Sequence, residues 1–254
     1  MAKEILCIIQ ARVGSIRLPG KVLLPLGGKA VLERIIERIK DSKKIDKIIV
    51  ATSVQAEDDK ISDLCQKINI DCFRGSENDV LDRYYQAAKD SGFSNVVRIT
   101  GDCPLIDPEI IDQVVELFQR EKLDYATNVI PPTFPDGLDV EIFSFESLVR
   151  ARQETKMKSE REHVTIYMWQ NSELFKQKHL NSSVDLSGKR WTLDNPEDYE
   201  FIKKIFDNLY LVKPKFRMND VLKFLETNPE LEKINQSIKR NEGLEKSLKE
   251  DEVI

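Results

Sequence analysis

The sequence predicts an α/β fold in which helices flank a mainly parallel mixed sheet. Short apolar runs rich in β-branched residues alternate with longer helical patterns through the first half of the chain. The apolar runs are nearly continuous, which is typical of strands that helices cover on both faces. This alternation is the pattern of βαβ units, whose consecutive strands lie parallel.

Four predicted strands account for the first half of the sheet, at residues 4–10, 47–52, 70–73 and 96–100. The helices expected with them span residues 31–39, 57–67, 78–90 and 108–120. In the first of these helices, apolar residues recur at steps of one, three and four, so that one stripe faces the sheet. If the strands lie in the order third, second, first, fourth, the loops after the first and fourth strands meet in one cleft.

The pattern changes after residue 125. Residues 128–137 carry three prolines and a glycine and therefore predict a loop. Strands are expected next at 138–143, 174–180 and 189–193, and helices at 145–153, 160–171, 195–207 and 219–226. We divide the chain into a domain of residues 1–210 and a charged, helical C-terminal extension of residues 211–254. From about residue 228 the sequence shows no core-sized apolar face.

Composition limits the classes of function. With 254 residues and 41% hydrophobic residues, the chain can form one large domain with a buried core. A net charge of -5 gives no overall positive field, so we expect no nucleic acid polymer as partner. No apolar run is long enough for a membrane span or a signal peptide, so we expect no membrane association and a cytoplasmic location. The four scattered cysteines predict reduced thiols.

The strongest candidate site follows the first predicted strand. The loop QARVGSIRLPGK, from Gln10 to Lys21, combines three cations, a hydroxyl group and two glycines. Glycine lets backbone N–H groups approach a polyphosphate, and the cations neutralise its charge. A P-loop is disfavoured because five residues separate Gly14 from Gly20 where four are required, and the dinucleotide motif GxGxxG is absent. The alternative is a surface turn with solvated charges.

A second candidate, RITGDCPLIDP, ends the fourth predicted strand. Asp102 follows the strand directly and can bind a hard divalent cation such as Mg²⁺, which prefers oxygen ligands. The alternatives for Asp102 are a turn or a cap for the helix that begins near Pro108. In WTLDNPEDYE, Asp194 can be a second metal ligand, but proline and acids in the next turn favour a helix cap there.

Further charged residues are candidates for contacts with a second substrate. In FPDGLDVE, Asp136 and Asp139 contact substrate hydroxyl groups or form a turn. In REH, Arg161 and His163 are candidate ligands, although a solvated helix start explains them equally well. Three residues of the third strand and its helix are candidates to line the cleft: Arg74, Ser76 and Asp82.

These motifs, together with FRGSENDVLDRYYQAA, resemble in order the spore coat polysaccharide biosynthesis protein F type of cytidylyltransferase. That group is similar to the acylneuraminate and 3-deoxy-manno-octulosonate cytidylyltransferases, which share the Rossmann-like, glycosyltransferase-A-like fold of the nucleotide-diphospho-sugar transferases. The resemblance covers about residues 5–206, and six motifs in the correct order are specific for nucleotidyl transfer. It implies that residues 1–210 are a nucleotidyltransferase domain and leaves the tail unexplained.

The resemblance implies Mg²⁺-dependent transfer of CMP from CTP to a sugar or sugar-like acceptor, with release of pyrophosphate, in surface polysaccharide or glycan biosynthesis. It implies Arg12, Lys21 and Asp102 as catalytic residues. It also implies that Asp102 and Asp194 bind the metal, which reverses the local interpretation of Asp194. The implied nucleotide-binding residues are Gln10, Ala11, Arg12, Gly14, Ser15, Arg17, Lys21, Arg74, Ser76, Asp82 and Thr100. The implied acceptor-side residues are Asp136, Asp139, Arg161 and His163.

The central motif TGDCP departs from the QGDEP of the octulosonate enzymes, so the resemblance does not predict which sugar is the acceptor. One alternative is a nucleotide-sugar-dependent glycosyltransferase, which normally carries a DxD-like motif that is absent at residues 100–103. Another alternative is a non-catalytic, nucleotide-binding regulatory subunit. Members of the family are often dimers, so a homodimer is a candidate assembly, with residues 125–143 as a candidate contact.

Overall fold

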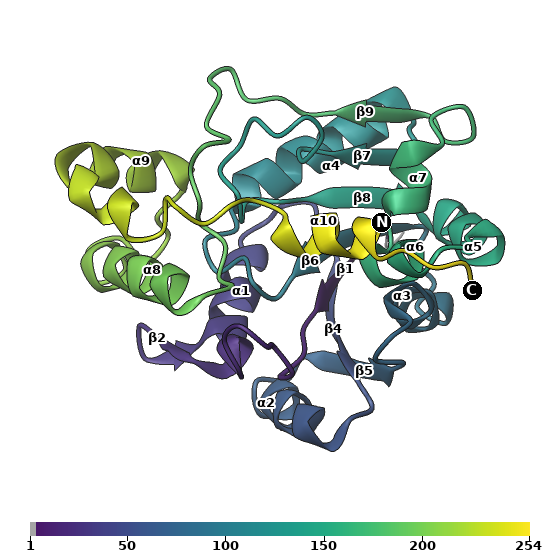
Figure 1. The fold of residues 1–254 in the computed structure, drawn as a ribbon, viewed down its shortest axis with the longest axis horizontal. Coiled ribbons are helices and arrows are strands. Elements are labelled where there is room, and N and C mark those ends of the chain that lie inside the picture. Colours follow the sequence, from purple (N-terminus) through teal and green to yellow (C-terminus); the bar gives the residue numbers. More distant parts are fainter. Residues whose placement is uncertain (1–3) are drawn as a thin grey trace.

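A seven-stranded mixed sheet forms the centre of the computed structural model, which describes residues 4–254 (Figure 1). In order across the sheet, the strands are β5 (Asp71–Gly75), β4 (Lys47–Ser53), β1 (Ile5–Gln10), β6 (Asn95–Thr100), β8 (Glu141–Ser144), β7 (Tyr125–Thr127) and β9 (Gln177–His179). The first four run parallel, whereas β8 is antiparallel to both of its neighbours. The predicted sheet, including the order third, second, first, fourth, is confirmed.

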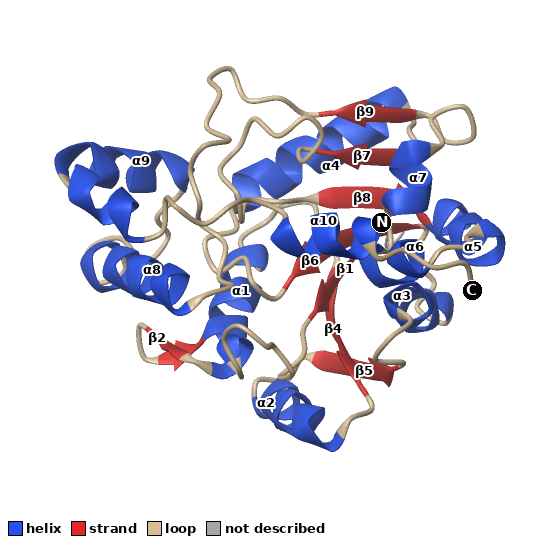
Figure 2. Cartoon of the chain, viewed as in Figure 1, coloured by secondary structure: helices blue, strands red, loops and turns tan. Residues whose placement is uncertain are grey.

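Helices cover both faces of the sheet (Figure 2). One face packs against α1 (Val31–Ile39), α2 (Asp59–Lys67), α4 (Pro108–Glu121), α8 (Pro196–Leu209) and α9 (Met218–Thr227). The other face packs against α3 (Val80–Lys89), α5 (Phe145–Glu154) and α7 (Ile166–Gln170), with the short α6 (Lys158–His163) beside α3. In β1, Cys7 and Ile9 belong to the first core and Leu6 and Ile8 to the second. Both faces of β1 are buried, which explains its unbroken apolar sequence.

Two predicted elements are wrong. Residues 189–193 form no strand apart from one bridge between Arg190 and Asp136. Their apolar side chains are buried in an irregular segment, and an apolar run alone does not distinguish such a segment from a strand. The predicted helix at 160–171 is divided into α6 and α7, because Val164 has a φ of 62° and ends α6.

Other differences lie at short elements. β8 begins at Glu141 and not at residue 138, because the side chain of Asn128 bonds the carbonyl of Leu138 and the N–H of Val140, both at 2.8 Å. The three-residue strand β7 was not predicted, and neither was the hairpin of β2 (Pro25–Leu26) and β3 (Lys29–Ala30). The hairpin turn consists of two glycines with positive φ, and a Gly-Gly pair is a sequence signal for a tight hairpin turn.

The segment after residue 210 packs against the rest of the chain. Phe216, Val221 and Leu225 are buried in the same core as α1 and α8. A 3₁₀ helix at Pro229–Ile234 and α10 (Glu242–Lys249) follow, and α10 itself buries no residue. Polar contacts therefore hold α10, and the division of the chain at residue 210 stays a prediction. Among residues 4–254, no helix is both long enough and apolar enough to cross a membrane.

Candidate active site

The carboxyl ends of β1 and β6 form the base of the site. The two strands are parallel neighbours with Gln10 opposite Thr100, and the N–H of Gly101 donates to the carbonyl of Gln10 at 2.8 Å. A Cβ atom at residue 101 would lie 3.0 Å from that carbonyl and 3.1 Å from the Cβ of the buried Ala11. Glycine at this position therefore lets the loops that follow the two strands run side by side.

Lys21 joins the two predicted metal carboxylates. Its ammonium group lies 2.7 Å from Asp194 Oδ1 and 3.3 Å from Asp102 Oδ2, and its side chain is only 12% exposed. Burial opposes the charge of Lys21, but the two carboxylates outweigh burial and raise its pKa above the ordinary value. Burial likewise opposes the charge of Asp102, but Lys21 and the Thr100 hydroxyl hold the pKa of Asp102 below its usual range. The ammonium group of Lys21 therefore lies between the carboxyl groups of Asp102 and Asp194.

One side-chain contact and one backbone contact fix Asp102. The Thr100 hydroxyl donates to Asp102 Oδ1, and the carbonyl of Asp102 accepts from the N–H of Leu193 at 2.8 Å. The cap of α4 is Asp107, whose Oδ1 accepts from the N–H of Glu109 at 2.9 Å. Asp102 is therefore not the cap of that helix.

The local interpretation of Asp194 as a helix cap does not hold. Asn195 is the N-cap of α8. The N–H groups of Asp194 and Asn195 donate to Asp198 Oδ2 at 3.0 and 2.9 Å. Because Asp198 satisfies these donors, the carboxylate of Asp194 contacts Lys21 and Arg17 instead.

The three predicted cations of the first loop differ in their surroundings. Arg17 lies 3.0 Å from Asp194 Oδ2 and 3.0 Å from Glu242 Oε2. Lys21 lies between the carboxylates, as described above. Arg12 is exposed and forms no hydrogen bond or ion pair with any residue of the described chain. Two of the three cations thus converge on one carboxylate, Asp194.

The remaining residues of the first loop shape it. The N–H of Ser15 bonds the carbonyl of Val13 at 2.7 Å, and the Ser15 hydroxyl accepts from the N–H of Leu18 at 3.4 Å. Gly14 lies in this tight turn, where an added Cβ would meet the flexible end of Glu57. The side chain of Gln10 accepts from Arg98 Nε at 3.3 Å, below the loop.

The predicted cleft residues of β5 and α3 are engaged in other contacts. Arg74 bonds Asp59 and the carbonyls of Ser53 and Gln55. The other two contacts are Ser76 Oγ with the N–H of Asp79 at 3.0 Å and Asp82 with Arg152 at 2.6 Å. None of the three predicted side chains touches the cluster of Lys21, Asp102 and Asp194, so their nucleotide role stays a prediction.

Asp136 and Asp139 lie together in the loop before β8. Arg190 pairs with Asp136 at 3.2 Å, and Arg240 pairs with Asp139 at 2.9 Å. Burial, partly offset by these arginines, raises the pKa of Asp136 to about 6 and that of Asp139 to about 7. Gly137 separates them with a φ of 98°, and an added Cβ would lie 2.6 Å from the backbone of residues 191–192. Glycine is therefore required for this close contact.

Arg161 and His163 lie on α6, away from these two acids. Arg161 bonds Asp79 at 3.3 Å and the carbonyl of Arg152 at 2.9 Å. Burial lowers the pKa of His163, and its Nε2 atom has no hydrogen-bond partner in the described part of the chain. Neither side chain contacts Asp136 or Asp139, so their acceptor role stays a prediction.

Residues 6–234 match the family model described as cytidylyltransferase. The chain belongs to the cytidylyltransferase family. This result confirms the predicted family. It also distinguishes the chain from the glycosyltransferase alternative.

Known relatives agree with the cytidylyltransferase family. The spore coat polysaccharide biosynthesis protein SpsF of Bacillus subtilis is 32% identical over 234 residues, which are 89% of this chain and 96% of that protein. A cytidylyltransferase structure from Leptospira borgpetersenii serovar Hardjo-bovis gives a TM-score of 0.85 at 37% identity, covering 90% of this chain and 96% of that one. CMP:2-keto-3-deoxy-manno-octonic acid synthetase complexed with CTP gives 0.63 at 17% identity, over 80% of this chain and 98% of that one. This last likeness confirms the nucleotide-diphospho-sugar transferase fold.

Sequence reasoning missed residues that organise this cytidylyltransferase site. Arg190 holds Asp198 through two bonds of 2.9 Å and also pairs with Asp136. Arg190 directly precedes the WTLD sequence, so the motif indicates where this residue lies but not what it binds. Arg240 and Glu242 lie more than a hundred residues from their partners, and no local pattern indicates them.

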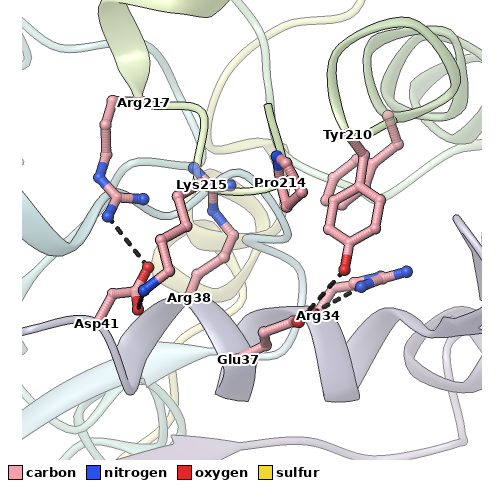
Figure 3. A pocket seen from close by; sticks show the side chains of 9 residues that line it. Arg34, Glu37, Arg38, Asp41, Tyr210, Pro214, Lys215 and Arg217 are labelled. Atoms are coloured by element: carbon pink, nitrogen blue, oxygen red, sulfur yellow. Dashed lines mark hydrogen bonds and ion pairs between the residues drawn. The ribbon is translucent and has the colours of Figure 1, made fainter. Parts of the chain in front are cut away.

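A separate cavity of about 90 Å³ lies between α1 and the α8–α9 connection (Figure 3). Its acids pair with its own cations, Asp41 with Lys215 at 2.7 Å and Glu37 with Arg34 at 2.6 Å. No residue of the predicted nucleotide, acceptor or metal sites lines it. In this cytidylyltransferase the cavity is therefore separate from the candidate active site.

The raised pKa of Asp139 predicts how the stability of the protein depends on pH. In the folded protein this carboxyl binds its proton more tightly than the ordinary value of 3.8 allows, so its contribution to stability is lost as pH rises from about 4 to about 7. Relative to Asp139→Asn, the free energy of unfolding of the wild type should fall by up to about 3 kcal/mol between about pH 4 and pH 8. Urea unfolding across this range measures the difference, and parallel curves would contradict it.

Proposed function

We propose that this protein transfers a CMP group from CTP to a hydroxyl group of a sugar or sugar-like acceptor. The acceptor oxygen attacks the α-phosphorus of CTP, the bond from that phosphorus to the oxygen bridging to the β-phosphate breaks, and pyrophosphate leaves. The proton of the acceptor hydroxyl passes to solvent water during the attack. The observation that carries the proposal is the convergence of Lys21 with Asp102 and Asp194 beside the loop that follows β1.

The cations of the first loop supply the electrostatic part of this reaction. Negative charge develops on the departing pyrophosphate, and fixed positive groups stabilise it more effectively than water does. Lys21 is held between carboxylates and is therefore already oriented before CTP binds. Arg17 is partly exposed and can exchange its carboxylate partners for phosphate oxygens, and the exposed Arg12 is available to the same phosphates.

Asp102 and Asp194 fit Mg²⁺. They present oxygen donors only, and they already share one cation, the ammonium of Lys21. Bound Mg²⁺ would add positive charge at the phosphates and lower the pKa of a hydroxyl group. Thr100 and the backbone of Leu193 hold Asp102 in position for such a ligand.

The acceptor is proposed to carry several hydroxyl groups. Asp139, in the loop before β8, has a partly exposed side chain, whereas the neighbouring Asp136 is buried. Carboxyl oxygens accept hydrogen bonds from sugar hydroxyls, so Asp139 is the acid that can contact the acceptor. The name of the Bacillus subtilis relative, a spore coat polysaccharide biosynthesis protein, supports a role in the supply of activated sugars for a surface polysaccharide. The homodimer and the cytoplasmic location stay predictions.

The test is to incubate the protein with Mg²⁺, one of the four nucleoside triphosphates, and a panel of acidic and phosphorylated sugars. We expect pyrophosphate release with CTP and a product heavier than its acceptor by one CMP group. A glycosyltransferase would release a nucleotide from a nucleotide sugar, and a regulatory subunit would bind CTP without turnover. Absence of pyrophosphate with every acceptor would contradict the proposed function.

A further inference from the structure

The last twenty residues lie across the loop that carries Asp136 and Asp139. Residues 235–254, which we name the C-terminal strap, begin directly after the segment that matches the cytidylyltransferase family, which ends at residue 234. In Figure 1 the strap runs from the region of α9 past the middle of the sheet to α6. Few of its side chains are buried, so its attachment depends on specific polar contacts.

The first attachment lies at the start of the strap. The amide of Asn235 is 2% exposed and donates to the carbonyl of Arg190 at 3.0 Å and to Asp198 Oδ1 at 2.9 Å. The carbonyl of Lys239 accepts from Arg190 Nη1 at 3.1 Å. The strap is therefore bound to the arginine that also holds Asp136.

Arg240 is the residue that the strap places against the loop of Asp136 and Asp139. Its Nη2 atom lies 2.9 Å from Asp139 Oδ1, and its Nη1 atom donates to the carbonyl of Phe134 at 3.1 Å. Its Nε atom lies 3.6 Å from Asp136 Oδ1. With 16% of its side chain exposed, Arg240 is the only cation within ion-pair distance of Asp139 in residues 4–254.

The part of the strap that follows Arg240 is also attached to the rest of the chain. Glu242 pairs with Arg17 of the first loop at 3.0 Å. Asp251 accepts from the N–H and the hydroxyl of Ser159 at 2.8 and 2.5 Å. The N–H of Lys158 donates to the carbonyl of Glu252 at 2.9 Å. The position of Arg240 is thus fixed from both sides.

We propose that Arg240 is a positioning residue for acceptor binding: the strap holds its guanidinium against Asp139 and the buried Asp136, and so fixes the carboxyl group of Asp139 for the hydroxyl groups of the acceptor. This inference rests on the proposed function. Asp139 is suited to the task because its side chain is 28% exposed and only one of its oxygens is engaged in a hydrogen bond within the described chain. The second oxygen is free to accept from a hydroxyl group.

The charges around Asp139 explain why a cation is required. Burial and the neighbouring Asp136, Glu141 and Asp102 all favour the protonated form of Asp139, and Arg240 opposes them. Without Arg240, the balance would shift further toward the protonated form, in which one carboxyl oxygen carries a proton and donates a hydrogen bond. The loop would also lose the bond to the carbonyl of Phe134, and both carboxylates would gain freedom of movement.

The experiment compares Arg240→Met, Arg240→Lys, Asp139→Asn and the double variant Arg240→Met with Asp139→Asn. Arg217→Met is the matched control, because Arg217 is also a partly buried arginine with acidic partners, 20% exposed, and lies outside the candidate site. Rates are measured with CTP and the acceptor from the panel on which the wild type is fastest. We expect Arg240→Met to raise the KM for the acceptor about tenfold while the KM for CTP stays within about twofold.

Two further results would support the positioning role. Arg240→Lys should recover part of the loss, and Arg240→Met should add little in the Asp139→Asn background, because the two residues act together. Equal increases in both KM values, or fully additive effects in the double variant, would overturn the inference in favour of a purely structural role.

Hydrogen exchange keeps the inference testable apart from the proposed function. If the wild type releases no pyrophosphate with any acceptor, the proposed function fails, but the strap is still examined through the backbone amides of residues 134 and 136–139. Arg240→Met should accelerate their exchange about tenfold while Arg217→Met leaves it unchanged. Equal exchange in wild type and Arg240→Met would overturn the inference.

Discussion

Asp102→Asn is expected to lower kcat about a thousandfold with the fold intact. Asp102 contributes one of the two carboxylates on Lys21, and the proposal assigns it to Mg²⁺. An amide keeps the size of the side chain but removes the negative charge that attracts a divalent cation. Removing a preoriented electrostatic group from an active site typically costs about 10²–10³ in rate. Pyrophosphate release at saturating CTP measures the loss.

Asp112→Asn is the matched control for this variant, because Asp112 lies on α4 and bonds Ser42 and Lys43 in the loop after α1. The control should retain activity. Calorimetric titration of Mg²⁺ in the presence of CTP should show weaker binding to Asp102→Asn than to the control. Full turnover by Asp102→Asn would remove Asp102 from the site.

Lys21→Ala is expected to lower kcat/KM for CTP about 10²- to 10³-fold. Lys21 is the most buried cation of the first loop, and its charge is proposed to stabilise the departing phosphates. Lys21→Arg should recover little, because the larger planar guanidinium does not fit a position between two carboxylates that a compact ammonium occupies. Steady-state rates at varied CTP concentrations measure both effects.

Lys29→Ala is the control for the loss of a lysine. Lys29 lies in the β2–β3 hairpin and forms a half-exposed ion pair with Glu37 of α1. We expect it to change neither activity nor the melting temperature appreciably. Lys21→Ala should keep a cooperative melting transition. Unchanged activity of Lys21→Ala would contradict the phosphate role.

The parallel half of the fold could be predicted because its signals are local. β1 is apolar on both faces, and the stripe of α1 matches the helical repeat, so strands and crossovers follow from pattern alone. The strand order then brings the loop of Lys21 beside Asp102. The second half was harder, because Asn128 replaces a backbone partner near β8 and Val164 interrupts a helix. Such contacts depend on tertiary structure and leave no periodic signal.

In the candidate site, too, some residues have a local sequence signal and others depend on tertiary contacts. Lys21 and Asp102 follow strand ends, where general rules place ligands in α/β folds. The proposed metal role of Asp194 comes from the family resemblance alone, because the local pattern favours a cap; the structure assigns that cap to Asn195. Arg240 could not be found from the sequence, because it is one arginine in a charged segment and its partner Asp139 is 101 residues away.

The distance along the chain between Lys21 and Asp194 has a consequence for biosynthesis. The two residues are separated by 173 positions, so a polypeptide still emerging from the ribosome lacks the second carboxylate until α8 is being made. A nascent chain cannot form the complete cluster of Lys21, Asp102 and Asp194 before then. Ligand added during refolding should therefore stabilise only the fully assembled protein and leave partly folded intermediates unaffected.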